Sequence, residues 1–408
     1  MQKKYFATKP DKQKAHSSKN PGRFHTMPQR TLTSTELEQL VLGACLLGGG
    51  GGGPLSGAQP LLDYLRRNRL TVTLAGLADL PADTPGAVVA GIGAPNAASQ
   101  SGDFTEAPLN AFRRYAKLLD TPPGAVLPAE VGAMNSLIPA VVAAQTGLPL
   151  IDADSAGRAL PTLNLAAFNL AAPPSPLLLA NQPAAGQEGV SITLNAANAS
   201  QTDSLVRANL SATDDTGYSL FGSVGAFSTW ALTPAQLAHS SVTGSTSRAI
   251  RLGAALRRVQ TEGGDAVAAV RTALDGQLTV LAQGTIRAVE LSEAGGFDRL
   301  QITLAADDGR IVHVLAVNEN LIAFAEGSAA PLAAAPDTLA WLTDDGHPLS
   351  NSEIRPDTAL RASVHLGRRI NLLGIPAAPI LREPVLASGF SALLAQLGYY
   401  GTAPALPV

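Results

Sequence analysis

Cysteine and long apolar runs are scarce in this 408-residue sequence, and each shortage excludes a class of protein. The one cysteine, Cys45, rules out an internal disulfide and any zinc or iron–sulfur site built on several thiolates. Such sparse use of cysteine favours a reducing, cytoplasmic compartment. No apolar run reaches the ~18–20 residues of a membrane-spanning helix, because glycine, proline and polar residues interrupt each one. The sequence therefore predicts a soluble protein that does not enter a membrane.

Aromatic and charged side chains are also few, at 4% and 15% of the residues, whereas apolar residues make up 46%. The core must be packed mainly from Ala, Leu and Val, with few aromatic platforms for a stacked cofactor. The apolar fraction excludes charge-driven disorder for most of the chain. Since domains usually hold roughly 100–200 residues, the length predicts two or three of them.

Lysine is almost confined to the N-terminus. Residues 1–26 contain seven basic side chains and one acidic side chain, and the rest of the chain contains a single lysine, Lys117. Residues 27–408 thus carry 22 basic and 31 acidic side chains, an excess that disfavours binding to nucleic acid. Because residues 1–26 lack the apolar stretch of a secretory signal, we predict a disordered leader outside the fold. A vector-derived or wrongly assigned start before Met27, a native disordered arm and a nucleic-acid-binding tail stay open for it.

The segment from 27 to about 170 alternates between helix and strand patterns. Thr33 and Glu36 have the spacing of a capping box, and apolar residues follow at helical spacing. Short apolar runs predict strands at 71–75, 87–92, 125–129 and 148–152, and helical patterns separate them at 56–69, 107–119 and 135–146. Such alternation is typical of βαβ units, so we predict a parallel α/β domain over residues 27–170.

The pattern changes after residue 170. Residues 171–186 are rich in Pro and Ala, which predicts a connection between domains. Strand patterns then dominate, with one helical pattern at about 247–260 and Asp-Asp-Gly turns at 307–309 and 344–346. We predict a β-rich α+β domain over 171–383 and a C-terminal segment, 384–408, that packs back on the body.

Six consecutive glycines, 48–53, precede Pro54 and predict a loop. A dinucleotide-binding fingerprint would need a strand before the glycines and an acidic residue about 20 positions later, where Thr73 stands instead. No Gly-Lys-Ser/Thr follows, which excludes a P-loop. Backbone N–H groups of Gly50, Gly51, Gly52 and Gly53 could still bind an anion or a developing oxyanion. The alternative is a loop that only allows two backbones to approach closely.

Two polar segments each leave a predicted strand. The first contains Glu130 and Asn135, and the second contains Asp152, Asp154 and Arg158. In parallel α/β sheets ligands bind beyond the carboxyl ends of the strands, so these side chains are expected to converge there. Neighbouring carboxylates suit acid–base catalysis or a hard cation such as magnesium or calcium. Helix capping and a structural Arg–Asp pair are the alternative.

Other catalytic classes have little support. Cys45 lies in an apolar helical pattern, where a thiol is normally packed as a small hydrophobe. The sequence contains neither a histidine pair at metal-binding spacing nor a Gly-x-Ser-x-Gly nucleophile elbow. We therefore predict no required cofactor and leave the metal open.

Several motifs, in one order along the chain, resemble those of a known family. They are the glycine run with Pro54, Gly93-Ala-Pro95, Glu130-Val-Gly-Ala-Met-Asn-Ser-Leu-Ile-Pro139, Leu148-Pro-Leu-Ile-Asp-Ala-Asp-Ser-Ala-Gly-Arg-Ala-Leu-Pro161, Gly295-Gly-Phe297 and Asn318-Glu319. Pro336-Asp337, Gly346, Glu353 and Gly398-Tyr-Tyr400 continue the match, which covers residues 33–400. The family is that of S-methyl thiohydantoin desulfurases, formerly DUF917. The resemblance implies a two-domain protein that acts in hydantoin catabolism and is encoded beside hydantoinase/oxoprolinase-type enzymes.

This chain departs from the family pattern at two places. The family commonly has Asp before the proline where this chain has Gly53, and Glu after the second motif's last proline where this chain has Thr162. Both departures remove a carboxylate that a metal ion or the family's substrate could use.

The resemblance implies hydrolytic removal of a thiomethyl group from C2 of a hydantoin-type ring. Asp152, Asp154 and Glu130 are the predicted catalytic carboxylates. Arg158 and the N–H groups of Gly50 to Gly53 would stabilise negative charge, and Asn135 would hold the ring amide. The alternative is a non-catalytic partner or small-molecule-binding subunit of a hydantoinase-type enzyme. A homo-oligomer is compatible with either function.

Overall fold

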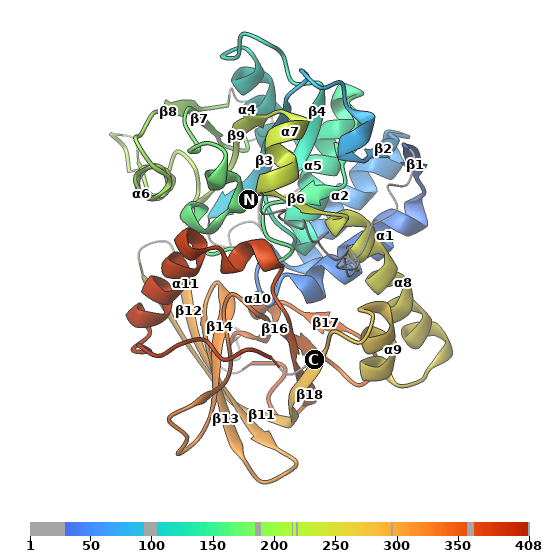
Figure 1. Ribbon diagram of the computed structural model, residues 1–408, viewed down its shortest axis with the longest axis vertical. Coiled ribbons are helices and arrows are strands. Elements are labelled where there is room, and N and C mark those ends of the chain that lie inside the picture. The colour runs from blue at the N-terminus through green and yellow to red at the C-terminus, as the bar shows by residue number, and fades with distance from the viewer. Residues whose placement is uncertain are drawn as a thin grey trace, which may run out of the picture.

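The protein is described here from a computed structural model, covering residues 29–93, 104–183, 189–213, 215–217, 219–294, 297–356 and 363–406. The predicted leader, 1–26, lies outside these residues. Two eight-stranded sheets form the frame of the molecule. Figure 1 shows the first sheet among the blue to green helices and the second, in orange, below it.

The first sheet has a parallel centre. Its order is β1-β2-β5-β4-β3-β9-β7-β8. The parallel strands are β2 (Val72–Ala75), β5 (Leu150–Ile151), β4 (Ala125–Pro128) and β3 (Gly86–Gly93). Val126 pairs with Leu150 on one side and with Ala87 on the other, and all three side chains are fully buried. The predicted parallel α/β fold is therefore confirmed.

The first sheet continues past the predicted domain boundary at residue 170. β9 (Val224–Leu232) pairs antiparallel with β3, and β7 (Leu177–Ala180) and β8 (Ser191–Leu194) follow it. The stretch predicted as a connection thus contains an inner strand. The physical reason is that the four residues of β7 are apolar and all buried, whereas the prolines that suggested a connection flank the strand, three before it and Pro183 after it. At the other edge β1 (Arg30–Leu32) pairs antiparallel with β2.

Helix α1 (Ser34–Leu47) begins at the predicted capping box. The Glu36 N–H donates to Thr33 Oγ1 at 3.2 Å, and the Thr33 N–H donates to Glu36 Oε2 at 2.8 Å. α1 packs against α5 (Ala133–Thr146) and α8 (Ser245–Glu262), and α5 also covers β2, β3 and β4. The first half of the molecule is the part of the chain before the second sheet, which starts at Thr279, and the second half is the rest. Other helices of the first half are α2 (Leu55–Arg67), α4 (Glu106–Ala116), α6 (Ala199–Leu210), α7 (Pro234–Ser240) and α9 (Ala266–Ala273).

The second sheet is antiparallel throughout, in the order β15-β14-β13-β12-β11-β18-β16-β17. Its strands are β11 (Thr279–Ala294), β12 (Phe297–Ala306), β13 (Ile311–Val317), β14 (Glu319–Ala325), β15 (Pro331–Ala334), β16 (Thr338–Leu342), β17 (Pro348–Leu349) and β18 (Arg369–Ile375). The predicted turn at 307–309 joins β12 to β13, with Gly309 at φ +87°. The predicted β-rich second half is confirmed.

The chain ends by bridging the two halves. α10 (Asn351–Ile354) follows β17, and α11 (Pro384–Gln396) contacts the 3₁₀ turn Leu163–Leu165 of the first half. Phe390 of α11 lies in one buried cluster with Leu165 and with Leu321 of β14. The C-terminal helix therefore holds both halves together.

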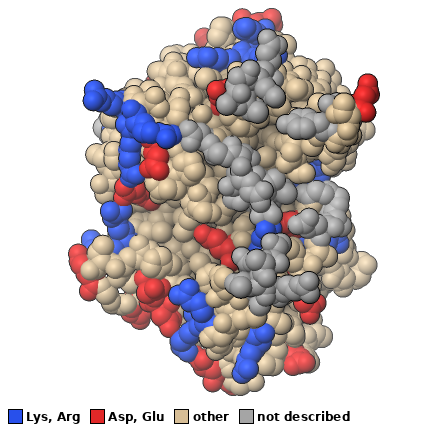
Figure 2. All heavy atoms as spheres, turned by 180° about the vertical axis from the view of Figure 1, so that it is seen from behind, with Lys and Arg blue, Asp and Glu red and all other residues tan. Residues whose placement is uncertain are grey.

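The surface carries mixed charge. On the face seen in Figure 2, Lys and Arg side chains lie interspersed with Asp and Glu side chains. Within the described ranges, no helix combines the length and the apolar character needed to cross a bilayer.

Candidate functional site

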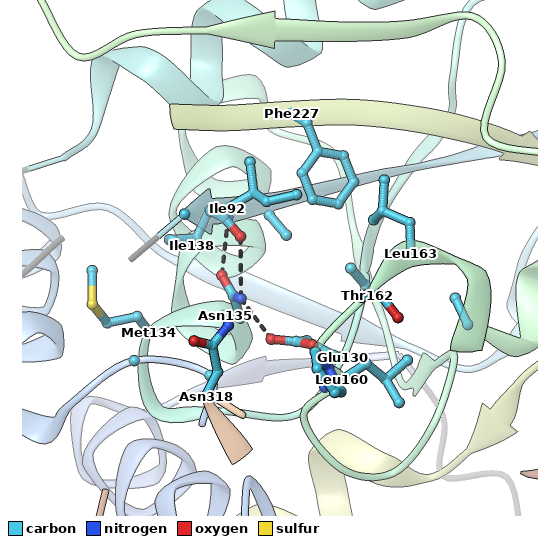
Figure 3. A pocket seen from close by; sticks show the side chains of 18 of the residues that line it. Ile92, Glu130, Met134, Asn135, Ile138, Leu160, Thr162, Leu163, Phe227 and Asn318 are labelled. Atoms are coloured by element: carbon cyan, nitrogen blue, oxygen red, sulfur yellow. Dashed lines mark hydrogen bonds between the residues drawn. The ribbon is translucent and has the colours of Figure 1, made fainter. Parts of the chain in front are cut away.

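A cavity of about 100 Å³ lies where the first sheet meets the start of β14. Its walls come from the ends of β3 and β4, the first turn of α5, residues 160–166, α6, and Asn318 and Glu319 of the second half. Figure 3 shows apolar side chains on one side of the cavity, among them Phe227, Ile92 and Ile138, and Glu130, Asn135 and Asn318 on the other. An engineered cavity of ~150 Å³ accepts benzene, so this space is of the order of size of one small ring.

Glu130 leaves the end of β4 and faces the cavity. Its Oε1 accepts from Asn135 Nδ2 at 2.7 Å, and its Oε2 accepts from the Leu160 N–H at 2.7 Å. Burial raises the pKa of Glu130 to about 7, against the lowering effect of these two hydrogen bonds. A carboxyl with such a pKa can accept and return a proton near neutral pH.

Asn135 orients Glu130. It lies in the first turn of α5, where its Oδ1 accepts from the Gly91 N–H at 2.9 Å and its Nδ2 donates to the Gly91 carbonyl at 3.3 Å as well as to Glu130. Both hydrogens of the amide are thereby used, since Nδ2 has two to donate. The dashed lines in Figure 3 show this bridge from β3 to Glu130. The prediction that Asn135 holds the ring amide stays a prediction.

The glycine loop joins the cavity to the second half. Gly52 and Gly53 line the cavity, and the Gly52 carbonyl accepts from the N–H groups of Met134 and Asn135 at the start of α5. A Cβ on Gly52 would lie 2.4 Å from the Cα of Gly132, which excludes any side chain. The close approach of two backbones, one of the two explanations for the glycines, is thus present here.

Gly50 and Gly51 precede Gly52 in the loop and are not among the residues that line the cavity. The Gly50 carbonyl accepts from the Asn351 N–H at 2.8 Å, so this part of the loop contacts α10. Whether N–H groups of Gly50 to Gly53 bind an anion stays a prediction.

Asp152 and Asp154 also lie away from the cavity lining. Asp152 accepts from the N–H of Ser247 at 3.0 Å and from its Oγ at 2.5 Å, in the first turn of α8. Asp154, in β6 (Ala153–Asp154), is fully buried and accepts from the N–H groups of Ala156 and Gly157 at 2.9 and 2.8 Å. Burial raises the pKa of Asp154 to about 7. Their predicted catalytic role stays untested, and their contacts are those of a helix cap and a turn.

Arg158 joins the two halves instead of lining the cavity. Its guanidinium donates to the carbonyls of Ala159, Pro336 and Asp337 at 3.0, 2.9 and 2.8 Å, and it lies 5.9 Å from the ring centre of Phe390. The side chain is 1% exposed, and burial lowers its pKa, which the carboxylates of Glu319, Asp337 and Glu130 oppose. Its predicted role in binding substrate stays a prediction.

Glu319 and Asn318 are site residues that residue chemistry alone did not single out. Both line the cavity from the turn between β13 and β14. Glu319 is 3% exposed, and its pKa lies well above the ordinary value. Burial is the main cause, and the nearby charge of Glu130 adds to it. The available signal was an Asn-Glu pair between two apolar strands, which entered only as a motif of the resemblance.

A second set of polar residues lines the cavity from α6. Arg207 Nε donates to Asp203 Oδ2 at 2.7 Å, its Nη2 donates to the Pro161 carbonyl at 2.7 Å, and its guanidinium lies 3.7 Å from the ring centre of Phe297. Asp203 in turn accepts from the Leu163 N–H at 3.0 Å. These contacts fix residues 161–163, so α6 shapes this wall. No motif in the sequence indicated that α6 reaches the site.

No group of three or more His, Cys, Asp or Glu side chains in the described part of the chain could hold a metal ion. Whether the protein binds magnesium or calcium through oxygen ligands stays a prediction. Cys45 is buried in α1, and burial raises the pKa of its thiol well above the ordinary value. A thiol in that state is a poor nucleophile.

Comparisons with known proteins agree with this two-part architecture. Residues 35–188 match the model of the S-Me-THD-like N-terminal domain, and residues 201–387 match that of the S-Me-THD-like C-terminal domain. The chain is also similar to a crystal structure of a protein from Chromobacterium violaceum, with 28% identity and a TM-score of 0.78 over 93% of this chain and all of that one. No curated protein matches. The two domain matches cover most of the sequence and confirm the resemblance seen in the motifs: the chain belongs to the S-methyl thiohydantoin desulfurase (S-Me-THD-like) family.

Proposed function

We propose that the protein hydrolyses an S-methyl thiohydantoin, replacing the thiomethyl group at C2 of the ring by oxygen and releasing methanethiol. The observation that carries the proposal is Glu130, a carboxyl with a raised pKa at the polar side of a small cavity whose opposite side is apolar. Family membership supports the substrate class.

The two sides of the cavity suit the two ends of such a ring. The polar side, with Glu130 and Asn318, faces the reacting C2, and the apolar side, with Ile92, Ile138 and Phe227, accepts an apolar substituent at C5. Burying one such substituent contributes about 1.5–3 kcal/mol. Rings derived from leucine or phenylalanine are therefore the substrates to try first.

Glu130 is the general base in this proposal. Its carboxylate takes a proton from water as the water oxygen bonds to C2 and the electron pair of the C2=N π bond moves onto the ring nitrogen. That pair re-forms the C=N bond as the C–S bond breaks with its electron pair leaving on sulfur, and the resulting 2-hydroxy ring is a tautomer of the hydantoin. The sulfur takes the proton back from Glu130 and departs as methanethiol. Asn135 positions Glu130 for both transfers through its bridge to Gly91.

The test is release of methanethiol by the purified chain from the leucine and phenylalanine S-methyl thiohydantoins, measured with a thiol-reactive dye. Mass spectrometry should find the corresponding hydantoin. Glu130→Gln should abolish most turnover, whereas Glu290→Gln, an exposed carboxylate on β11, should not change it.

The alternative is a small-molecule-binding subunit of a hydantoinase-type enzyme. In that case the chain would bind the ring without releasing methanethiol and would co-purify with a hydantoinase-type partner. Either result without turnover would contradict the hydrolase proposal.

A further inference from the structure

Glu319 brings a second carboxyl into the cavity, from the opposite half of the molecule. It is the first residue of β14, and its neighbour Asn320 anchors this strand to the glycine loop by donating its N–H to the Gly49 carbonyl at 2.8 Å. Oε2 of Glu319 is buried and has no hydrogen-bond partner among the described residues. An unpaired buried oxygen in a cavity wall is a place for a ligand to bind, because leaving it unpaired is costly.

Gly51 gives this carboxyl its space. A Cβ on Gly51 would lie 1.9 Å from Oε1 of Glu319 and 2.5 Å from its Cδ. Gly51 does not have a positive φ, so its backbone would accept alanine, and the close carboxyl is what requires glycine here. The glycine loop therefore leaves the space that the Glu319 carboxyl occupies at the junction of the two halves.

The charged groups around Glu319 decide which carboxyl keeps a proton. Burial and the nearby Glu130 raise its pKa, while Arg158 and Arg207 lower it. Arg158 donates its hydrogen bonds to backbone carbonyls, and Arg207 donates to Asp203 and to the Pro161 carbonyl, so both arginines act on Glu319 through their charge. Two carboxyls in one cavity resist a double negative charge. Glu130 accepts two N–H hydrogen bonds that stabilise its ionised form, whereas Oε2 of Glu319 has no donor among the described residues, so Glu319 holds the proton while Glu130 ionises.

We propose that Glu319 is the proton donor of the cavity, and that the ligand is a ring with an amidine-type carbon, that is, a carbon bearing a basic ring nitrogen and a heteroatom leaving group. The inference rests on the proposed function, to which it adds the general acid that protonates the ring nitrogen. Protonation of that nitrogen makes the carbon more electrophilic. A neutral cyclic imide has no basic ring nitrogen, so a proton donor could not activate it in this way.

The step balances with the groups present. Glu319 gives its proton to the ring nitrogen as Glu130 takes one from water and the hydroxyl adds to C2. The hydroxyl proton then returns to Glu319 as the C=O bond forms. Methanethiolate leaves with the C–S electron pair and takes the proton from Glu130, so both carboxyls regain their starting states.

The first test is the pH dependence of kcat/KM for methanethiol release. Glu319→Gln should lower it by about 10²–10⁴-fold at neutral pH and remove the decline at high pH, where the wild type loses the acid's proton. Gly51→Ala should cause a similar loss by displacing an unchanged Glu319. Glu290→Gln is the matched control and should behave as wild type. A Glu319→Gln enzyme with wild-type rate and pH profile would overturn the proposal.

The second test does not depend on turnover. Infrared difference spectroscopy at pH 7 should show a protonated-carboxyl band that disappears when 2-amino-imidazol-4-one, an amidine-type ring, is added, and persists with hydantoin. Glu319→Gln should lack this response. If the response occurs but no ring releases methanethiol, the proposed function fails and the proton donor stands; if the response survives Glu319→Gln, the proton donor fails alone.

Discussion

The two acidic segments, 130–135 and 152–158, lie side by side but hold their carboxylates in different surroundings. The Val131 N–H donates to the Arg158 carbonyl and the Ser155 N–H donates to the Ala129 carbonyl, both at 3.2 Å. In the first segment Glu130 faces a cavity. In the second, Asp152 is bound by Ser247 at the start of α8.

The difference shows how neighbouring carboxylates acquire separate roles. Asp152 accepts hydrogen bonds at a helix start, where negative charge is stabilised whatever the ligand. Glu130 is oriented by one amide and one N–H and leaves its remaining acceptor capacity toward the cavity. Chemistry is thus expected in the first segment and stability in the second.

The largest effect should come from exchanging carboxylate for amide in each segment. Glu130→Gln should lower methanethiol release by about 10²–10⁴-fold, because the general base is lost. Asp152→Asn should leave kcat within a few-fold of wild type. Steady-state kinetics on both variants checks the comparison, and a reversed order would return the role of base to Asp152.

The sequence predicted the fold better than the division of work between these segments. Alternating apolar runs were enough to predict the parallel strands, and the Thr33–Glu36 spacing predicted the start of α1. Both signals depend on residues that are close in sequence, and the structure contains the elements that they predict.

The site required contacts between distant parts of the chain. Glu319 reaches Gly51 across 268 positions of sequence, and Asp152 meets Ser247 across 95. No spacing rule reports which of two acidic segments faces a helix start and which faces a cavity. The same limit applies to Arg158, because no pattern in the sequence indicates that its guanidinium donates to the carbonyls of Pro336 and Asp337.

The next largest effect should be on stability, at Arg158 in the second segment. Arg158→Ala leaves the carbonyls of Pro336 and Asp337 without their donor and removes a buried cation beside Glu319. Removing one partner of a buried charged network typically costs about 3–5 kcal/mol. Urea denaturation should show this loss. Arg258→Ala, on an exposed part of α8, is the control and should leave the midpoint unchanged.

A smaller effect should be seen in the pH dependence of stability. Asp154 has its pKa raised from 3.8 to about 7 by burial, so between these values the folded chain keeps a proton that the unfolded chain has released. The free energy of unfolding should therefore fall as pH rises from about 4 to about 7. Asp154→Asn should make this fall shallower, measured by urea denaturation at pH 5 and pH 8. Asp83→Asn, at an exposed position, should leave it unchanged.

The smallest effect should come from removing the helix cap itself. Asp152→Ala takes two hydrogen bonds from the start of α8, and loss of a cap costs about 1 kcal/mol. The matched control is Asp265→Ala, which removes the cap of α9, where Asp265 accepts from the Ala268 N–H at 2.9 Å. Both variants should lower the melting temperature by about 1 °C and retain turnover, since both then lose only a cap. If Asp152→Ala loses 10²-fold in turnover, in the range of an acid–base residue, while Asp265→Ala does not, the carboxylate of the second segment takes part in the chemistry and the contrast with Glu130 collapses.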